Sequence, residues 1–384
     1  MSVGSGGGAG ASPDLAAEVD AFISAQPLGR PPVELAARVE WLVDFQHRLH
    51  DARLAVVSWP ERFGGRDLTP FQSIEVAAAL GDAQAPELIN FVATEVVAPA
   101  LMDHATEDQL KRWLVPMAGA EEVWCQLFSE PDAGSDLASL RTRAERDGDG
   151  WRITGTKLWS TWAQFAGKGL VLARTGPLDT RHRTIGAFVI DMDQAEIQVN
   201  PLTTMTGAAE FAEVVFDGAY VAADDVVGDV DAGWRVAMAM LENERGPYAL
   251  RRVAVLGSGL ARLQQRAREA HLTPRQRERV VDATIAMRLL ELRAANVASL
   301  LEAGSPLGAE STLTKVALTQ AEQTVFAVAH ELLGAGGIAW EGEEPEEVEH
   351  ALYSRAASIY GGSAQIQRNV LAERYLGLPP EPRP

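Results

Sequence analysis

Two short stretches carry the side chains best suited to hold a flat, phosphate-bearing ligand. The stretch QLFSEPDAGSD offers the side chains of Gln126 and Ser129, and its Ala-Gly-Ser turn lets the backbone approach a ligand closely. The stretch KLWST offers Trp159 as an aromatic wall, with Ser160 and Thr161 as hydroxyl donors beside it. A flavin needs hydrogen-bond donors for its pyrimidine edge and phosphates, together with an aromatic surface. The residue types in these two stretches would suit a flavin.

The elements that position these stretches fall into three parts that follow a tail. Residues 1–12, rich in Gly, are expected to form a flexible tail. Residues 13–121 repeat apolar residues at helical spacing and predict an α-helical domain, with Thr69 and Thr106 as helix N-caps. Residues 122–228 change to a period of two, which predicts a β-barrel or sandwich. Residues 229–384 return to long amphipathic runs, so we expect an α+β fold that ends in a helical bundle with an oligomer interface.

Composition excludes several classes of protein. The net charge of −19 over 384 residues argues against a general nucleic-acid surface. No apolar run approaches the ~20 residues that span a bilayer, and the N-terminus does not have the pattern of a signal peptide. The single cysteine, Cys125, favours a reducing cytoplasm. The histidines are not spaced as metal ligands, so no metal is expected.

Five segments of the chain, in their order, resemble the acyl-CoA dehydrogenase family. They lie between about Trp59 and Pro379 and read WPERFGGRDLTP, HATEDQLKRWLVPMAGAEEVWCQLFSEPDAGSD, ITGTKLWST, EVVFDGAYVAADDVVG and YGGSAQIQRNVLAERYLGLP. The resemblance implies that the C-terminal domain is a four-helix bundle. It also implies FAD-dependent α,β-dehydrogenation of an acyl thioester, a homodimer or homotetramer, and an electron-transfer flavoprotein or similar electron acceptor.

The resemblance also implies which residues contact the FAD. Those expected to border the isoalloxazine are Gln126, Phe128, Ser129, Trp159 and Thr161, with Ser160 alongside. Gly134 and Ser135 are expected near the diphosphate or the substrate, and the C-terminal loop adds Gly362, Ser363 and Gln365. Many members of the family carry an Arg-x-Phe-Gly segment for a neighbouring subunit's cofactor. This chain has no such segment between Ala270 and Val281, so contacts to the adenine half are not predicted.

The expected reaction requires a base, and the chain lacks one where many members of the family have it. Their C-terminal loop carries a Glu after the Tyr, whereas Tyr360 is followed here by Gly361. An α-proton base works best as a carboxylate in an apolar pocket, which raises its pKa. In the branch that includes isovaleryl-CoA and long-chain acyl-CoA dehydrogenases, the base lies on a helix in a Leu-x-x-Glu-Arg segment. The segment LENER resembles it, so Glu244 is the expected base and Arg245 its electrostatic support.

Two alternatives remain open from the sequence alone. The chain could be a flavin-holding but catalytically silent subunit of a heteromeric dehydrogenase, which the missing loop Glu would favour. It could also be a flavin monooxygenase on the same fold, which needs no α-proton base. Intact QLFSEPDAGSD and LENER segments argue against the silent subunit, and bleaching of the flavin by an acyl thioester alone would argue against the monooxygenase.

Overall fold

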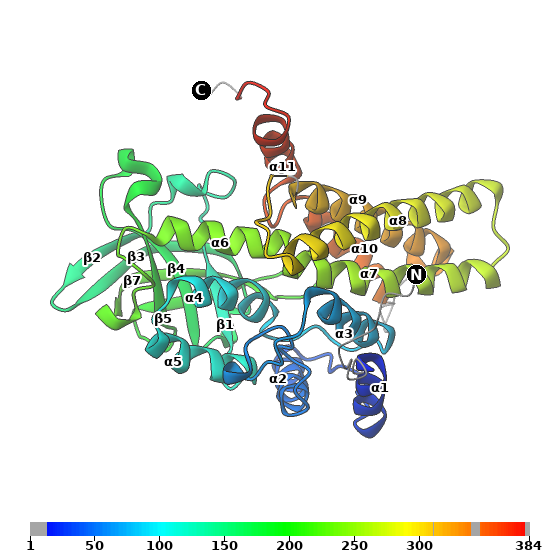
Figure 1. Ribbon diagram of the computed structural model, residues 1–384, viewed down its shortest axis with the longest axis horizontal. Helices are drawn as coiled ribbons and strands as arrows, with labels where there is room; N and C mark the ends of the chain where they lie inside the picture. Colours follow the sequence, from blue (N-terminus) through cyan, green and yellow to red (C-terminus); the bar gives the residue numbers. More distant parts are fainter. Residues whose placement is uncertain (1–13, 310, 339–345, 381–384) are drawn as a thin grey trace, which may run out of the picture.

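A computed structural model describes residues 14–309, 311–338 and 346–380 of the chain. It consists of an N-terminal group of helices, a curled sheet and a C-terminal helical bundle (Figure 1). The α+β architecture predicted from the sequence is confirmed. The tail predicted over residues 1–12 lies outside the described residues.

The N-terminal helices begin where the sequence places capping residues. They are α1 (Leu15–Ala25), α2 (Leu35–Asp51), α3 (Pro70–Asp82), α4 (Ala98–His104) and α5 (Glu107–Ala118), with a π-helical turn at Ala93–Val97 before α4. Thr69 accepts a hydrogen bond from the Gln72 amide at 3.3 Å, and the Gln72 side chain accepts one from the Thr69 amide at 3.0 Å. Thr106 and Gln109 form the same reciprocal pair at the start of α5. Both predicted N-caps are therefore confirmed.

The middle part is a sheet of seven strands in the described residues. The strands are β1 (Trp124–Leu127), β2 (Arg143–Asp147), β3 (Gly150–Thr161), β4 (Lys168–Arg174), β5 (Ile185–Asp191), β6 (Ile197–Leu202) and β7 (Phe211–Val221). Their order is β1-β4-β2-β3-β7-β6, and β5 pairs with the other side of β4. One face buries an apolar core, in which Trp151 meets Phe188 edge to face with ring centroids 5.5 Å apart. The opposite face of β1, β4 and β5 is apolar as well and packs against the N-terminal helices, so these strands are buried on both faces.

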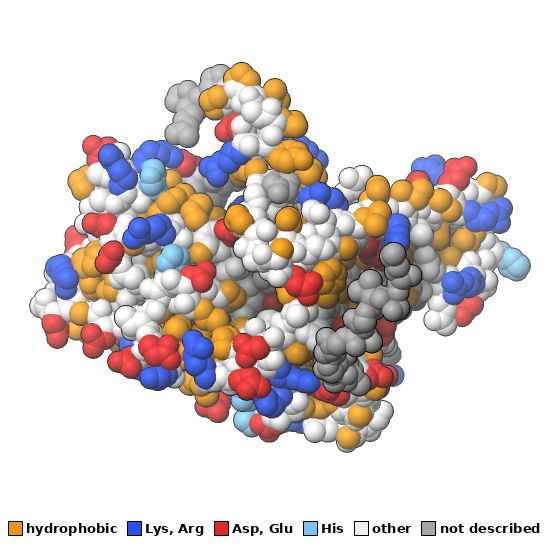
Figure 2. All heavy atoms as spheres, viewed as in Figure 1, with side chains coloured by type: hydrophobic (Ala, Val, Ile, Leu, Met, Phe, Trp, Pro, Cys, Tyr) orange, Lys and Arg blue, Asp and Glu red, His pale blue; other side chains and the backbone are white. Residues whose placement is uncertain are grey.

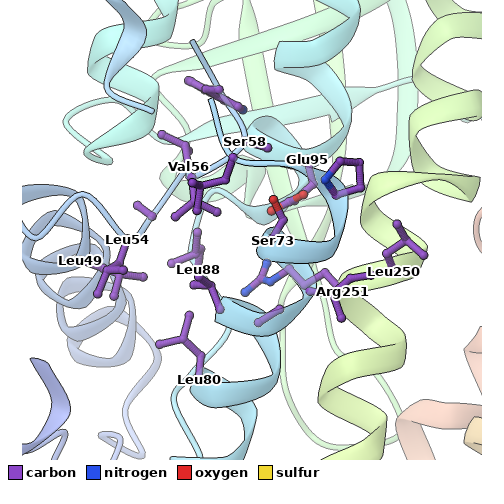
Figure 3. Close-up of a pocket in the computed structure, with 18 of the residues that line it drawn as sticks. Leu49, Leu54, Val56, Ser58, Ser73, Leu80, Leu88, Glu95, Leu250 and Arg251 are labelled. Carbon is purple, nitrogen blue, oxygen red and sulfur yellow. The ribbon is translucent and has the colours of Figure 1, made fainter. Parts of the chain in front are cut away.

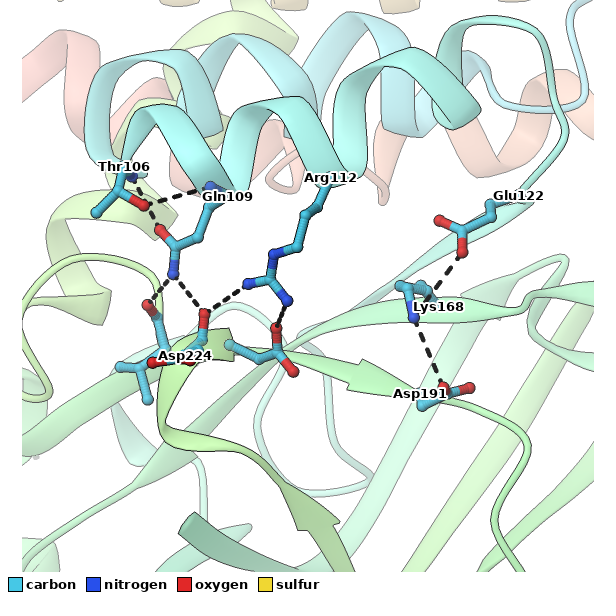
Figure 4. Close-up of polar contacts among 9 residues, drawn as sticks. Thr106, Gln109, Arg112, Glu122, Lys168, Asp191 and Asp224 are labelled. Atoms are coloured by element: carbon cyan, nitrogen blue, oxygen red, sulfur yellow. Dashed lines mark hydrogen bonds and ion pairs between the residues drawn. The ribbon is translucent and has the colours of Figure 1, made fainter. Parts of the chain in front are cut away.

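Helix α5 is held by directional polar contacts to the turn that follows β7 (Figure 4). The buried Gln109 amide donates to the carbonyls of Asp224 and Val226, at 2.9 and 2.8 Å. Arg112 donates to the Asp224 carbonyl at 2.9 Å and pairs with Asp225 at 3.1 Å. These contacts fix the N-terminal helices against the sheet, so the residues on both sides of this junction keep a defined relative position.

The C-terminal part contains the longest helices. They are α6 (Gly233–Arg245), α7 (Pro247–Glu269), α8 (Pro274–Glu302) and α9 (Ser311–Leu332), followed by the shorter α10 (Glu346–Tyr353) and α11 (Ala364–Val370). Helices α7, α8 and α9 share an apolar core, and α10 packs on α9. Apolar side chains gather on the surface around α11, at the top of Figure 2, where Tyr375, Leu376 and Leu378 are exposed.

Helix α6 connects the sheet to the bundle. It packs against β5 and α4, and it ends at Gly246, where the chain turns into α7 (Figure 1). The last turn of α6 therefore lies where the three parts of the protein meet. Among the described residues, no helix is both long and apolar enough to cross a membrane.

Candidate active site

The carboxylate of Glu244 fills the space beside the C-terminal loop glycine. A β-carbon on Gly361 would lie only 2.6 Å from Glu244 Oε1, closer than side chains pack. Gly361 also has φ +65°, a conformation that favours glycine. The carboxylate of Glu244 thus occupies the space that a side chain at position 361 would otherwise take. This is the arrangement expected if the base lies on α6 and not in the C-terminal loop.

Lys315, on α9, is the cationic neighbour of this carboxylate. Its side chain is 5% exposed, and its Nζ lies 4.0 Å from the centre of the Tyr360 ring. Its Cε would be 3.3 Å from a β-carbon on Gly361, so it borders the same space as Glu244. Burial lowers the pKa of Lys315 to about 8, while Glu244 and Glu322 act in the opposite direction.

The electrostatics of Glu244 suit a proton acceptor. Burial raises the pKa of its carboxyl above the ordinary value, and the charges of Lys315 and Arg245 partly offset that rise. Arg245 Nε is buried and has no hydrogen-bond partner in the part of the chain that the structure describes. A buried donor without an acceptor, next to a carboxyl whose pKa is raised, is typical of sites that bind a ligand.

The loop that carries Gly361 is held by buried polar contacts. Gln367 is 2% exposed and donates to the Gly361 carbonyl at 2.7 Å. Thr319 of α9 donates to the Ala357 carbonyl at 2.9 Å. One turn further along α9, Glu322 forms a buried ion pair with Arg252 of α7 at 2.8 Å. The loop and the two helices therefore hold Glu244 and Lys315 in a fixed relation.

The QLFSEPDAGSD stretch forms β1 and a loop anchored by Glu130. This carboxylate pairs with Lys157 at 2.8 Å and accepts hydrogen bonds from the amides of Arg141 and Thr142. Burial acts to raise the pKa of Glu130, but the ion pair with Lys157 and these hydrogen bonds outweigh it and lower the pKa. The buried ion pair therefore anchors the start of the loop to Lys157 of β3.

The predicted residues of this stretch lie in two environments. Gln126 and Ser129 are partly exposed at the end of β1, whereas the Phe128 side chain is buried. Gly134 and Ser135 are exposed at the tip of the loop, and nothing lies within 4 Å of a β-carbon placed on Gly134. The backbone at the loop tip is therefore exposed around Gly134 and Ser135.

In the KLWST stretch, the hydroxyl groups of Ser160 and Thr161 lie in different environments. Trp159 is 58% exposed, has φ +61° at an irregularity in the pairing of β3 with β7, and meets Phe211 edge to face at 6.0 Å. Thr161 is partly exposed, but Ser160 is fully buried and its Oγ has no partner among the described residues. The structure therefore does not place the Ser160 side chain beside Trp159 as a donor, because alternate residues of a strand point to opposite faces.

The three predicted residues of the C-terminal loop lie around the start of α11. Gly362 has φ +83°, and Ser363 caps the helix by accepting from the Ile366 amide at 3.3 Å. Gln365 is exposed. Gln367, two residues further along the chain, was not singled out from the sequence, and its side chain is buried against the Gly361 carbonyl.

These features fit an FAD on observations of the structure itself. An exposed tryptophan, Trp159, supplies a flat apolar wall, and nothing lies within 4 Å of a β-carbon placed on Gly134 at the loop tip. Trp159 is the one exposed aromatic side chain beside the QLFSEPDAGSD loop among the described residues, since the Leu158 amide donates to the Ser129 carbonyl, so it is the surface on which a flavin ring would pack. Bound there, a flavin would supply a hydride acceptor.

Comparison with known proteins gives the family. The models of the acyl-CoA dehydrogenase N-terminal, middle and C-terminal domains match residues 15–121, 125–219 and 231–376. The chain is 37% identical over 363 residues to acyl-CoA dehydrogenase IpdE1 of Mycobacterium tuberculosis, covering 94% of each.

Two solved structures share the fold. One is described as the Tcur3481-Tcur3483 steroid ACAD, with a TM-score of 0.84, 24% identity, and coverage of 96% of this chain and 97% of that one. The other is the ChsE4-ChsE5 complex from Mycobacterium tuberculosis, with a TM-score of 0.81, 23% identity, and coverage of 97% and 99%. Since three domain models together match most of its length, this chain belongs to the acyl-CoA dehydrogenases, a family of FAD-dependent oxidoreductases.

Proposed function

We propose that this protein oxidises an acyl thioester to its α,β-unsaturated product, with Glu244 as the base that removes the α-proton. The observation that carries the proposal is the position of Glu244 Oε1 against Gly361, 2.6 Å from where a β-carbon would be. Position alone does not make a base, but the raised pKa of this carboxyl favours proton uptake.

Each neighbouring residue has a role in this scheme. Glu244 accepts the α-proton, and a bound FAD would supply the acceptor for the β-hydride. The charges of Lys315 and Arg245 lower the pKa of Glu244 against the effect of burial, and so favour the ionised form that accepts a proton. Trp159 would border the flavin ring, with the polar groups of Gln126, Ser129 and Thr161 around its edge. Gly362 and Ser363 would approach it from the C-terminal loop.

The experiment is an anaerobic titration of the purified protein with acyl thioesters, followed by the flavin absorbance. We expect about one non-covalent FAD per subunit, and bleaching by a suitable acyl-CoA or acyl-carrier-protein thioester. A flavin that bleaches only with an added reductant would favour the monooxygenase or the silent subunit. Rapid reoxidation by an electron-transfer flavoprotein would identify the electron acceptor.

We also propose that the C-terminal helices form the subunit interface of a homodimer or homotetramer. Val281, Ile285, Leu289 and Leu292 recur at helical spacing on α8, and each is more than half exposed. A continuous apolar stripe of this kind on a soluble helix is typical of an interface. Light scattering on the purified chain tests this, and a strict monomer would favour assembly with a different subunit.

A further inference from the structure

A buried ammonium group, that of Lys315, lies beside the proposed base. Among the described residues, its Nζ takes part in no hydrogen bond and no ion pair. Instead, Nζ lies over the face of the Tyr360 ring, 4.0 Å from the ring centre. An aromatic face attracts a cation, and the attraction is strongest where water is excluded. The Tyr360 ring therefore stabilises this charge where a carboxylate in direct contact would otherwise do so.

The Tyr360 ring is fixed relative to α9, the helix that carries Lys315. One turn after Lys315, on the same face of α9, Thr319 donates to the Ala357 carbonyl at 2.9 Å. The ring also packs against Tyr353 of α10, with ring centroids 6.4 Å apart. The contact between ring and ammonium is therefore held by the packing of the loop on α9, and not by the two side chains alone.

The other charged groups close to Lys315 oppose one another. Glu322 raises the pKa of Lys315 and Arg252 lowers it, and these two residues pair with each other at 2.8 Å. Arg251, the neighbour of Arg252 on α7, points instead into a cavity that it shares with Glu95 (Figure 3). The carboxyl of the proposed base and the aromatic ring therefore remain as the groups that favour the ammonium form against burial.

Further titratable groups surround this cluster on the elements packed against it. They are Glu87, Arg245 of α6, Tyr248 of α7 and Tyr353 of α10. Burial raises the pKa of Tyr248, Tyr353 and Tyr360, so the three phenols are uncharged near neutral pH. Tyr360 therefore acts on the ammonium group through its ring face and not through a charge.

We propose that Tyr360 is a positioning residue for the reaction: its ring face keeps Lys315 protonated beside Glu244, and Lys315 in turn favours the ionised base. Glu244 Oε1 and Lys315 Cε lie 2.6 and 3.3 Å from the β-carbon position of Gly361, the residue that follows the ring. The effect on Glu244 rests on its proposed role as the base, whereas the effect of the ring on Lys315 does not.

The first measurement is the pKa of Lys315 in the FAD-loaded protein, by NMR of lysine labelled with carbon-13 at Cε. The chain has four lysines, so loss of one signal in Lys315→Met assigns it. The Tyr360 hydroxyl makes no hydrogen bond with a described residue, so Tyr360→Phe should keep the pKa of about 8. Tyr360→pentafluorophenylalanine has nearly the same shape but an electron-poor face, and should lower this pKa by about one pH unit. Tyr360→trifluorophenylalanine should give an intermediate value.

The second measurement is the pH profile of flavin reduction, with a thioester that bleaches the wild-type protein. The acid limb should move to higher pH in Tyr360→pentafluorophenylalanine, because Glu244 loses a charged neighbour. In the Lys315→Met background, the same change at Tyr360 should not move the limb further. A role of the ring in packing alone would lower the rate at every pH and leave the limb in place.

A matched control is Tyr353→pentafluorophenylalanine, which alters the adjacent ring and should leave both measurements unchanged. An unmoved Lys315 pKa in the fluorinated Tyr360 variants, or an equal fall in the Tyr353 variant, would overturn the inference. A lowered Lys315 pKa with an unmoved acid limb would overturn the link to Glu244. A lowered Lys315 pKa in a protein whose flavin no thioester bleaches would overturn the proposed reaction and leave the effect of the ring standing.

Discussion

The steric relation between Gly361 and Glu244 leads to a quantitative prediction for Gly361→Ala. Ordinary van der Waals contact begins at 3.4 Å, so a β-carbon at 2.6 Å forces the carboxylate to retreat by about 0.8 Å. A misplacement of about 1 Å can cost about 10²-fold in rate, so we expect flavin reduction to slow by about tenfold to a hundredfold. The left-handed backbone at Gly361 adds about 1–2 kcal/mol of destabilisation.

Stopped-flow absorbance under anaerobic conditions measures this rate directly. The matched control is Gly304→Ala, because Gly304 has φ +62° and nothing lies within 4 Å of its β-carbon position. It should lose the same stability in a thermal melt while reducing its flavin at the wild-type rate. A Gly361→Ala enzyme that binds FAD and reduces it at the wild-type rate would refute the steric argument.

Three further predictions concern charge, loop anchoring and assembly. Removing the Lys315 charge in Lys315→Met should raise the pKa of Glu244 further, so the acid limb of the pH profile of flavin reduction should move to higher pH; Lys315→Arg should keep it in place, and an unmoved limb in Lys315→Met would contradict the electrostatic role. Glu130→Gln leaves the Lys157 ammonium buried without its counter-charge and should cost about 3–5 kcal/mol in chemical denaturation at neutral pH, with partial recovery in Glu130→Gln/Lys157→Met. Because the folded-state pKa of Glu130 is depressed, the wild-type advantage over Glu130→Gln should be present above the ordinary value of 4.5 and shrink as the pH falls through the folded-state pKa; a constant difference would contradict this. Leu289→Asp should convert the oligomer to monomers in light scattering, whereas a change at exposed Arg268 should not.

The architecture was predictable because local signals agree along the chain. The Thr69 and Thr106 capping boxes depend only on residues three positions apart, and the change from helical to strand periodicity is visible in any short window. These features need no knowledge of distant contacts. The irregularity in β3 near Trp159 did need it, because its φ of +61° follows from the pairing with β7.

The site was predictable only in part, because it depends on contacts between residues that are distant in the sequence. The LENER segment and Gly361 could be read as a pair through the family resemblance, but the 2.6 Å relation between them is a property of the fold. Lys315 was missed because a lysine inside an amphipathic run gives no local sign that it is buried. Gln367 was missed because its inward orientation depends on the turn at the two glycines.

Ser160 is the converse case, a residue that the sequence points to but that the structure buries. A hydroxyl beside an aromatic wall looks like a donor in the sequence, yet strand alternation at this point sends the Ser160 side chain into the interior. The bulge between Lys157 and Ser160 decides which of the neighbouring residues faces outward. A bulge of this kind leaves no clear mark in the residue pattern.

The most direct test of the central claim is anaerobic flavin reduction in Glu244→Gln, with a thioester that bleaches the wild-type enzyme. Loss of a positioned base is worth about 10²–10⁴-fold, so the variant should keep its fold and FAD but lose nearly all bleaching. Glu242→Gln, two residues away on the same helix, should bleach at the wild-type rate. A Glu244→Gln enzyme that reduces its flavin as fast as the wild type would contradict the assignment of the base.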